Sequence, residues 1–273
     1  RLRSKDISGV RRSQYTGERA ELLKVRFEKG LQRLVDKGDP DLLIDEPAAL
    51  GGFGFRGFNK AYNEDTLRFF RMTSLLQDAA LLKDFRLPGR RKTVWEIGGG
   101  WGGLAFQFKT LCPDVTYLIT GQAELFLVSA VYLRTVFPGA RVRFYDPADP
   151  DAFWRDWDQV DFAFAPECIV AGMRPPSLDL VLDMATLERM TPSRIVRHVE
   201  VAYRQECRYF LSACPVGEPD PAFAVPVNPA LEARYWLHPV STPAGLHKRL
   251  ALPLPGRDAI DRTYRLGCRR LRV

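Results

Sequence analysis

The stretch Val94-Trp95-Glu96-Ile97-Gly98-Gly99-Gly100-Trp101-Gly102-Gly103-Leu104 decides the fold class of this chain. An apolar strand candidate, 93–97, precedes the glycines, and a helix candidate, 102–111, follows them. Glycines at such a junction permit a tight turn and let the backbone approach a ligand, while the start of the helix adds unpaired N–H groups. The stretch therefore predicts a ligand-binding turn at the end of a buried strand.

Two ligand classes use a loop of this kind. The dinucleotide pattern G-x-G-x-x-G fits Gly98, Gly100 and Gly103, whereas the pattern E-x-G-x-G-x-G fits Glu96 and the glycines up to Gly102. A carboxylate at the strand end repels a pyrophosphate and suits S-adenosylmethionine, which carries an ammonium and a sulfonium group. Glu96 therefore favours S-adenosylmethionine, and a nucleotide or a purely structural glycine turn are the alternatives.

Short apolar runs alternate with helical stretches from Thr93 onward. The strand candidates are 93–97, 115–119, 142–145, 162–165, 178–182 and 208–212, and the helix candidates are 102–111, 123–136 and 193–206. This alternation predicts a Rossmann-like, doubly wound, mostly parallel α/β sheet covered on both faces. Beyond Cys214 a proline-rich stretch is expected to lead to one or two late strands, and 255–273 fits either a helix or a strand.

Residues 1–90 are expected to form a helical extension ahead of a ligand-binding domain over 91–273. Apolar residues recur at helical spacing in 1–45 and again in 64–84. Between them, four glycines alternate with three phenylalanines in Gly51–Phe58, which predicts a loop with apolar anchors.

Composition excludes several classes of protein. With 273 residues, 46% hydrophobic and 27% charged, the chain can bury a large core and is not a disordered or disulfide-stapled scaffold. The net charge of +7 comes mostly from both ends, without interleaved aromatic residues, so no nucleic-acid partner is expected. No apolar run approaches the roughly 20 residues of a membrane span, so no membrane partner is expected.

Cysteine and histidine patterns give no sign of a cross-link or a metal site. The five cysteines are irregularly spaced and form no CxxC pair, which fits reduced thiols in a cytoplasmic protein. No histidine spacing indicates a metal site, and a metal requirement is left open. A homo-oligomer is left open.

The run Glu96–Gly103 resembles motif I of class I S-adenosylmethionine-dependent methyltransferases. Four stretches together are similar to the sugar O-methyltransferases of bacterial biosynthetic gene clusters: Gly51–Phe58, Val94–Phe106, Tyr117–Phe137 and Asp179–Met190. The resemblance implies methyl transfer from S-adenosylmethionine to a sugar or a glycosylated small molecule in natural-product or glycan biosynthesis. The alternatives are a non-sugar acceptor and a catalytically inert partner protein with the same fold.

Two departures from that family pattern bear on the inert alternative. After the second strand such enzymes carry an acidic residue that holds the ribose, whereas this chain has Thr120 and Gly121, followed by Gln122 and Glu124. The family also shows an acidic residue before Met190, where this chain has an arginine. Gln122 or Glu124 is expected to supply the ribose contact instead.

The candidate site residues follow from the motif and from the strand ends. Glu167 follows the strand candidate 162–165, where the resemblance implies a contact with the adenine. The expected cofactor-binding residues are Glu96, Gly98, Gly99, Gly100, Trp101, Gly102, Thr120, Gln122, Glu124, Glu167 and Asp183. Trp101 is expected to pack beneath the glycine loop or beside the adenosyl group.

A base or a metal is expected because sugar hydroxyls are poor acids. The catalytic candidates are Asp183 at a strand end, Glu188 near the same cleft and His198 on the helix candidate 193–206. Their structural alternatives are a turn cap, an exposed helical glutamate and a structural histidine. His238 is a candidate for a substrate loop, and His247 for the surface. The aromatic residues considered for stacking on a sugar are Trp154, Trp157, Tyr235 and Trp236.

Overall fold

The structure is a computed structural model, and it describes residues 15–16, 18–215, 227–240 and 262–270. One large sheet has the strand order β5-β6-β4-β3-β7-β8-β10-β9. Its strands are β3 Lys92–Ile97, β4 Val115–Gly121, β5 Val142–Phe144, β6 Phe162–Pro166, β7 Leu180–Asp183, β8 Tyr209–Pro215, β9 Tyr235–Val240 and β10 Arg262–Arg269.

Strand direction divides this sheet into two parts. The strands from β5 to β8 are parallel, whereas β10 pairs antiparallel with both β8 and β9. The first parallel strand in the sequence, β3, pairs with β4 on one side and β7 on the other. The chain order therefore reverses at β3, and such a switch point opens a crevice at the carboxyl ends of the strands. The predicted fold class is confirmed.

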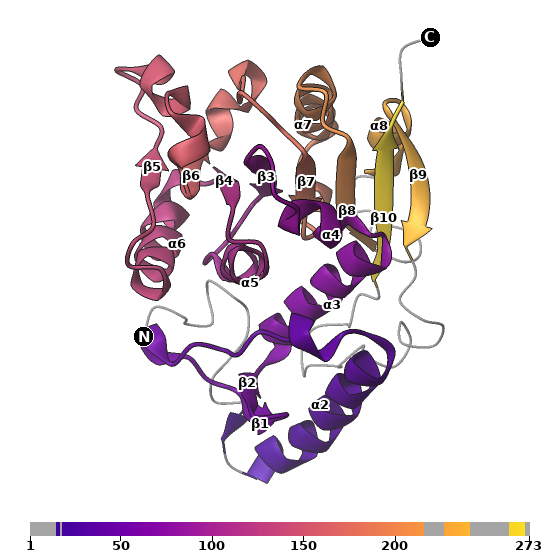
Figure 1. Cartoon of the computed structure of the whole chain (residues 1–273). Helices are drawn as coiled ribbons and strands as arrows, with labels where there is room; N and C mark the ends of the chain where they lie inside the picture. Colours follow the sequence, from indigo (N-terminus) through magenta and orange to yellow (C-terminus); the bar gives the residue numbers. More distant parts are fainter. Residues whose placement is uncertain (1–14, 17, 216–226, 241–261, 271–273) are drawn as a thin grey trace.

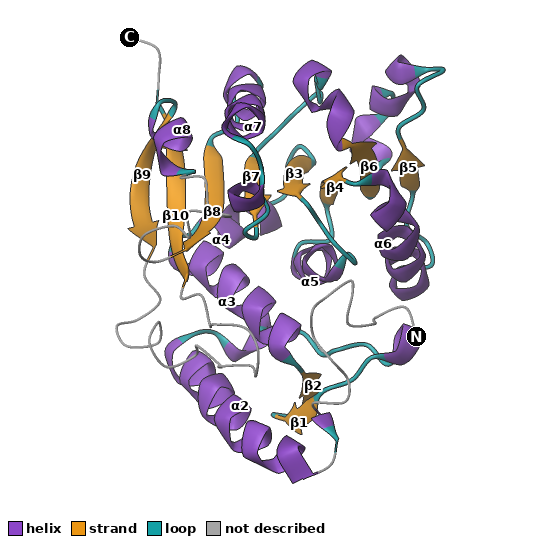
Figure 2. Cartoon of the chain, turned by 180° about the vertical axis from the view of Figure 1, so that it is seen from behind, coloured by secondary structure: helices purple, strands orange, loops and turns teal. Residues whose placement is uncertain are grey.

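Helices cover both faces of the sheet, as Figures 1 and 2 show. One face carries α3 Glu64–Asp78, α4 Leu81–Arg86, α5 Gly103–Leu111 and α6 Ala123–Val136, and the other carries α7 Pro192–Arg204 and α8 Asn228–Glu232. Because side chains alternate along a strand, Val94 lies in the core under the first group and Trp95 in the core under the second.

The N-terminal elements extend the molecule beyond α3 (Figure 1). Helix α2 spans Glu18–Lys37 and packs on α3. The expected loop 51–58 is instead partly a small antiparallel hairpin, in which β1 Phe55–Gly57 pairs with β2 Lys60–Tyr62. Phe55 anchors this hairpin because its ring is buried against Phe27 and Tyr62.

Other element boundaries in the structure differ from those predicted from the sequence. The helical stretch 64–84 is two helices, because Ala80 takes a left-handed conformation with φ 59° between α3 and α4. The late strands are β9 and β10, so part of the undecided stretch 255–273 is a strand. The proposed boundary after residue 90 falls between α4 and β3, and one hydrophobic core contains residues from both sides of it, such as Leu75 and Val94.

Candidate functional site

The glycine loop joins β3 to α5 at the switch point of the sheet. Its first glycine, Gly98, donates a backbone hydrogen bond of 2.7 Å to the carbonyl of Thr120 at the end of β4. The loop then closes with a bond of 2.9 Å from the Gly102 N–H to the Gly99 carbonyl. Three of its glycines have positive φ: 75° at Gly98, 52° at Gly100 and 89° at Gly102. This conformation favours glycine over residues with a side chain.

The space around these glycines differs from one to the next. A Cβ at Gly98 would stand 2.3 Å from the hydroxyl oxygen of Thr186, and one at Gly99 would stand 2.7 Å from the side chain of Ile119. A Cβ at Gly100 would meet no heavy atom within 4 Å. The loop is therefore packed against the protein at its base and open at Gly100, where its backbone can face a ligand.

Glu96 lies beneath the loop and is almost fully buried. Its Oε2 accepts a hydrogen bond of 3.0 Å from the hydroxyl of Tyr117, and it stands 3.2 Å from the position of a Cβ at Gly99. Burial raises the pKa of Glu96 to about 7, and the bond from Tyr117 opposes this shift. A cation that binds above the loop would favour the ionised form of this carboxyl.

The end of β4 presents the residues that replace the usual acid. Thr120 is buried, and its hydroxyl accepts a hydrogen bond of 2.8 Å from the indole N–H of Trp95, so its side chain serves the core. Gln122 and Glu124 are exposed at the start of α6, where Gln122 occupies the N-cap position without a capping bond from its side chain. Of these three side chains, Gln122 and Glu124 are therefore the ones that a ligand can reach.

Trp101 packs away from the open side of the loop, toward the N-terminal helices. Its indole N–H donates a hydrogen bond of 3.3 Å to Asp65 at the start of α3, and its ring lies edge-on to Tyr132, with the ring centres 4.9 Å apart. Trp101 therefore packs between the glycine loop and the helices α3 and α6.

Asp183 ends β7 and has no exposed surface. Its Oδ1 accepts the backbone N–H groups of Thr186 at 2.7 Å and Leu187 at 3.0 Å, and its Oδ2 accepts the hydroxyl of Ser212 at 2.7 Å. Burial raises its pKa to about 6, although these three bonds oppose the shift. The contacts favour the structural alternative, a turn cap, over direct contact with an acceptor.

The other two catalytic candidates lie at different depths. His198 is fully buried on α7, where its ring stacks on Trp95 with the centres 5.7 Å apart and its Nδ1 lies 2.8 Å from the Arg194 carbonyl. Burial lowers its pKa, and its contacts are those of a core residue rather than a base in a cleft. Glu188 lies on the turn η7, Leu187–Arg189, which Asp183 caps. The side chain of Glu188 is buried, whereas the structural alternative was an exposed helical glutamate.

Glu167 follows β6 at the same edge of the sheet. It begins the turn η6, Glu167–Gly172, and forms a two-pronged ion pair with the guanidinium of Arg194 on α7. The carboxylate of Glu167, which was expected near an adenine, is thus paired with a guanidinium.

The aromatic and histidine candidates lie elsewhere. Trp154 and Trp157 line a hollow at the amino ends of the strands, and Tyr235 is buried. Trp236 is exposed on β9 beneath Arg270, far along the sheet from β3. His238 stands in strand β9 rather than in a substrate loop. His247 lies outside the described residues.

Sequence reasoning missed Tyr117, Thr186 and Ser212. Tyr117 and Thr186 support the glycine loop, and Ser212 holds Asp183. Tyr117 and Ser212 each contact a residue on a neighbouring strand, and Thr186 lies on a turn that contacts the glycine loop. Only the order and register of the strands bring these residues together, so no local pattern in the sequence marks them.

Two further findings concern metals and membranes. Within 15–16, 18–215, 227–240 and 262–270, no group of three or more His, Cys, Asp and Glu side chains is placed to hold a metal ion. None of the helices in this part of the chain has the length and apolar character of a membrane span.

Comparison with known proteins bears on the fold. No protein family model matches the chain, and no curated protein matches it. Among solved structures, an O-methyltransferase family protein from Burkholderia thailandensis is 13% identical over 76% of this chain and 60% of its own, with a TM-score of 0.43. The S-adenosylmethionine-dependent methyltransferase SibL is 13% identical over 95% and 73%, with a TM-score of 0.40. WbdD, co-crystallised with a kinase inhibitor, is 13% identical over 87% and 47%, with a TM-score of 0.50.

These likenesses concern the fold alone. The chain spans between 46% and 60% of the length of the Burkholderia protein, the pyocyanin biosynthetic protein PhzM and WbdD. The strand order, the glycine loop after β3 and the likeness to WbdD show that this chain has a Rossmann-like, doubly wound fold.

Proposed function

We propose that this protein is an S-adenosylmethionine-dependent O-methyltransferase that acts on a sugar or a glycosylated small molecule. One observation carries the proposal: the glycine loop at the switch point is open at Gly100 and lies over the buried carboxyl of Glu96. An open backbone above a carboxyl suits a cationic ligand better than a pyrophosphate. The sugar rests on the resemblance of the four sequence stretches.

The residues at this edge fit such a cofactor. S-adenosylmethionine supplies an electrophilic methyl group on its sulfonium. Around it, the loop from Gly98 to Gly100 would contact the ligand through its backbone, and Glu96 would provide negative charge from below. Gln122 and Glu124 would hydrogen-bond the ribose hydroxyls, because their side chains are exposed at the end of the neighbouring strand.

In this proposal, Glu188 acts as the general base. Asp183 caps the turn that carries Glu188, and its own oxygens are occupied by three donors. A fixed turn holds Glu188 in one place at the edge where an acceptor hydroxyl would bind. Glu188 would then take the proton of that hydroxyl, and Asp183 would position it.

A second candidate function is a protein that binds the cofactor without catalysis. It is favoured by the full burial of both Asp183 and His198, together with Thr120 and Gly121 where such enzymes carry an acid. The two functions share a cofactor site and differ in turnover.

Methyl transfer from isotopically labelled S-adenosylmethionine to a panel of sugars, nucleotide sugars and glycosides tests the proposal. A labelled product with the mass of one added methyl group supports an O-methyltransferase, and Glu188→Gln should lower its rate about 10²–10⁴-fold. Bound cofactor without any product supports the non-catalytic function. If neither the cofactor nor its demethylated product binds, both functions are excluded.

A further inference from the structure

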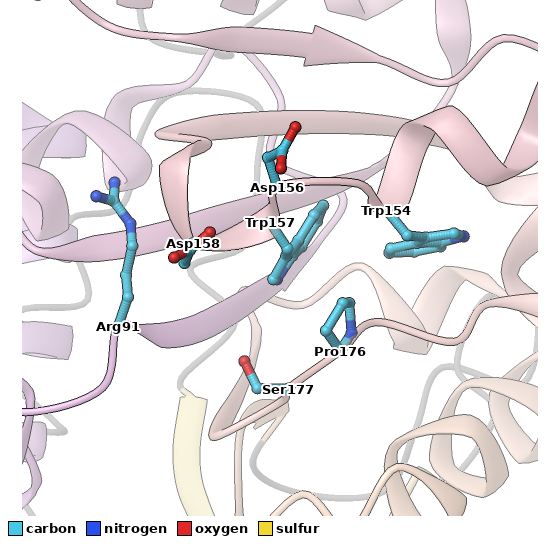
Figure 3. Close-up of a pocket in the computed structure, with 7 residues that line it drawn as sticks. All are labelled: Arg91, Trp154, Asp156, Trp157, Asp158, Pro176 and Ser177. Atoms are coloured by element: carbon cyan, nitrogen blue, oxygen red, sulfur yellow. The ribbon is translucent and has the colours of Figure 1, made fainter.

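Trp154 and Trp157 lie together at the amino ends of the parallel strands, whereas the glycine loop lies at their carboxyl ends. Trp154 ends the turn η4, Pro150–Trp154, and Trp157 begins the turn η5, Trp157–Gln159. Both turns precede β6, and the other walls of the hollow come from Arg91 before β3 and Ser177 before β7. The hollow measures about 340 Å³ and is shown in Figure 3.

The tryptophan rings form a fixed aromatic corner in this hollow. Their centres are 5.2 Å apart and their planes are inclined by 51°. The indole N–H of Trp157 donates a hydrogen bond of 2.9 Å to the Thr93 hydroxyl, which lies 2.9 Å from the hydroxyl of Ser177. The ring of Trp157 is thus held before any ligand arrives, which lowers the entropy lost on binding.

Polar groups surround the corner. Asp156 and Asp158 are exposed, and the structure gives their carboxylates no hydrogen bond or ion pair with any residue that it describes. Arg91 is fixed by Asp161 at 2.6 Å and by the Val115 carbonyl at 3.0 Å. Its Nη1 makes no such bond within the described part of the chain, and Arg91 is one of the residues that line the hollow.

This lining combines hydrogen-bond donors, hydrogen-bond acceptors and a flat apolar surface. The two carboxylates and Arg91 line the same hollow, and Asp156 also borders a smaller hollow that Arg141 and Arg143 line. A neutral ligand with one apolar face and several hydroxyl groups matches all three features, because an indole ring buries apolar C–H groups while carboxylates accept and guanidinium donates hydrogen bonds.

We propose that this hollow is a saccharide-binding site, separate from the glycine loop and without a catalytic role. A pyranose ring packs its C–H face on Trp154, and its hydroxyls donate to Asp156 and Asp158. Arg91 donates to a ring or hydroxyl oxygen. The site goes beyond the proposed function, since it lies at the amino ends of the strands and needs neither the cofactor nor methyl transfer.

Indole N–H signals in NMR spectra of the full chain test this site, because the chain has five tryptophans. The probes are D-glucose, D-mannose, D-galactose and N-acetyl-D-glucosamine, each added without cofactor up to tens of millimolar. We expect at least one sugar to shift the Trp154 and Trp157 signals in a saturable way and to leave Trp236 unchanged. Trp154→Phe assigns the first of these signals.

Matched variants locate the contacts. Asp158→Ala should weaken binding about tenfold, since hydrogen bonds to a charged group contribute roughly 1.5 kcal/mol or more. Asp151→Ala, an exposed aspartate of the neighbouring turn η4 outside the hollow, should leave binding unchanged. Gly100→Ala should also leave it unchanged, so a failure of the cofactor site is distinguished from a failure of this one.

Three outcomes would overturn the proposal. The first is the absence of a saturable shift at Trp154 or Trp157 with every sugar. The second is a shift confined to Trp101, which would place the sugar at the glycine loop. The third is a stronger response of Trp154 and Trp157 to choline than to any sugar, which would assign the hollow to organic cations.

Discussion

The hydroxyl of Tyr117 donates a hydrogen bond of 3.0 Å to the carboxylate of Glu96, beneath the glycine loop. The two residues stand on neighbouring parallel strands, and both are buried. Burial raises the pKa of Glu96 to about 7 and also raises that of Tyr117. Glu96 is therefore a group below the loop whose charge changes near neutral pH.

The first prediction concerns stability and pH. A folded pKa of about 7, above the ordinary 4.5, means that the folded state holds a proton which the unfolded state has released. The free energy of unfolding therefore falls as pH rises between these two values. Glu96→Gln removes this titration. The free energy of unfolding of the variant, relative to that of the parent, should therefore rise by about 1–3 kcal/mol as the pH increases from about 5 to about 8.

Urea unfolding of both proteins over that pH range measures the difference. Asp183, with a pKa of about 6, adds a loss of the same sign to parent and variant alike, so it cancels in the comparison. Tyr117→Phe provides the control: it removes the bond that lowers the pKa of Glu96, so the fall should extend to higher pH. A pH-independent difference between Glu96→Gln and the parent would contradict the prediction.

The second prediction concerns the open side of the loop. Gly100→Ala introduces a methyl group that meets no protein atom within 4 Å. A loss of affinity for S-adenosylhomocysteine would therefore show that the ligand occupies the space of this methyl group. We expect affinity to fall at least about tenfold by calorimetry, which corresponds to about 1.4 kcal/mol. The positive φ at this position should also cost about 1–2 kcal/mol of stability.

Gly51→Ala is the matched control, because Gly51 has a φ of 85° and equally open surroundings outside the loop. It should lose similar stability and keep the affinity of the parent. Equal affinity in Gly100→Ala, or tight binding of NAD by the parent without a response to S-adenosylhomocysteine, would refute the cofactor assignment.

The third prediction concerns the ribose. Replacing Gln122 or Glu124 with alanine should weaken cofactor binding by roughly 1–3 kcal/mol, the usual loss when a hydrogen-bond partner in a site is removed. Arg134→Ala, in the last turn of the same helix, should have no effect. Unchanged affinity in both single variants and in the double variant would show that the ribose is held by other residues.

The fourth prediction separates the two roles of Asp183. Asp183→Ala leaves two backbone N–H groups and the Ser212 hydroxyl without their acceptor, so it should cost about 2–4 kcal/mol of stability. Asp183→Asn retains one acceptor oxygen and should keep turnover within about tenfold. A loss of about 10²–10⁴-fold in the asparagine variant at normal stability would instead assign the proton transfer to Asp183.

Much of the fold could be predicted from the sequence because its signals are local. The glycine run after an apolar strand, and the alternation of strands with helices, indicated a parallel sheet with a ligand-binding turn, as observed. The break at Ala80 and the hairpin from Phe55 to Tyr62 were missed, because local spacing does not distinguish one long helix from two, or a loop from a short strand pair.

By itself, the sequence determined the position of the loop and the approximate position of each parallel strand. The tertiary structure alone decided which side chains a ligand can reach. Burial depends on segments far apart in the chain: Trp95 of β3 covers His198, and Ser212 of β8 completes the shell around Asp183. Likewise, the indole of Trp157, before β6, donates a hydrogen bond to Thr93 at the start of β3. This contact forms because the strand order brings the amino ends of these parallel strands close together.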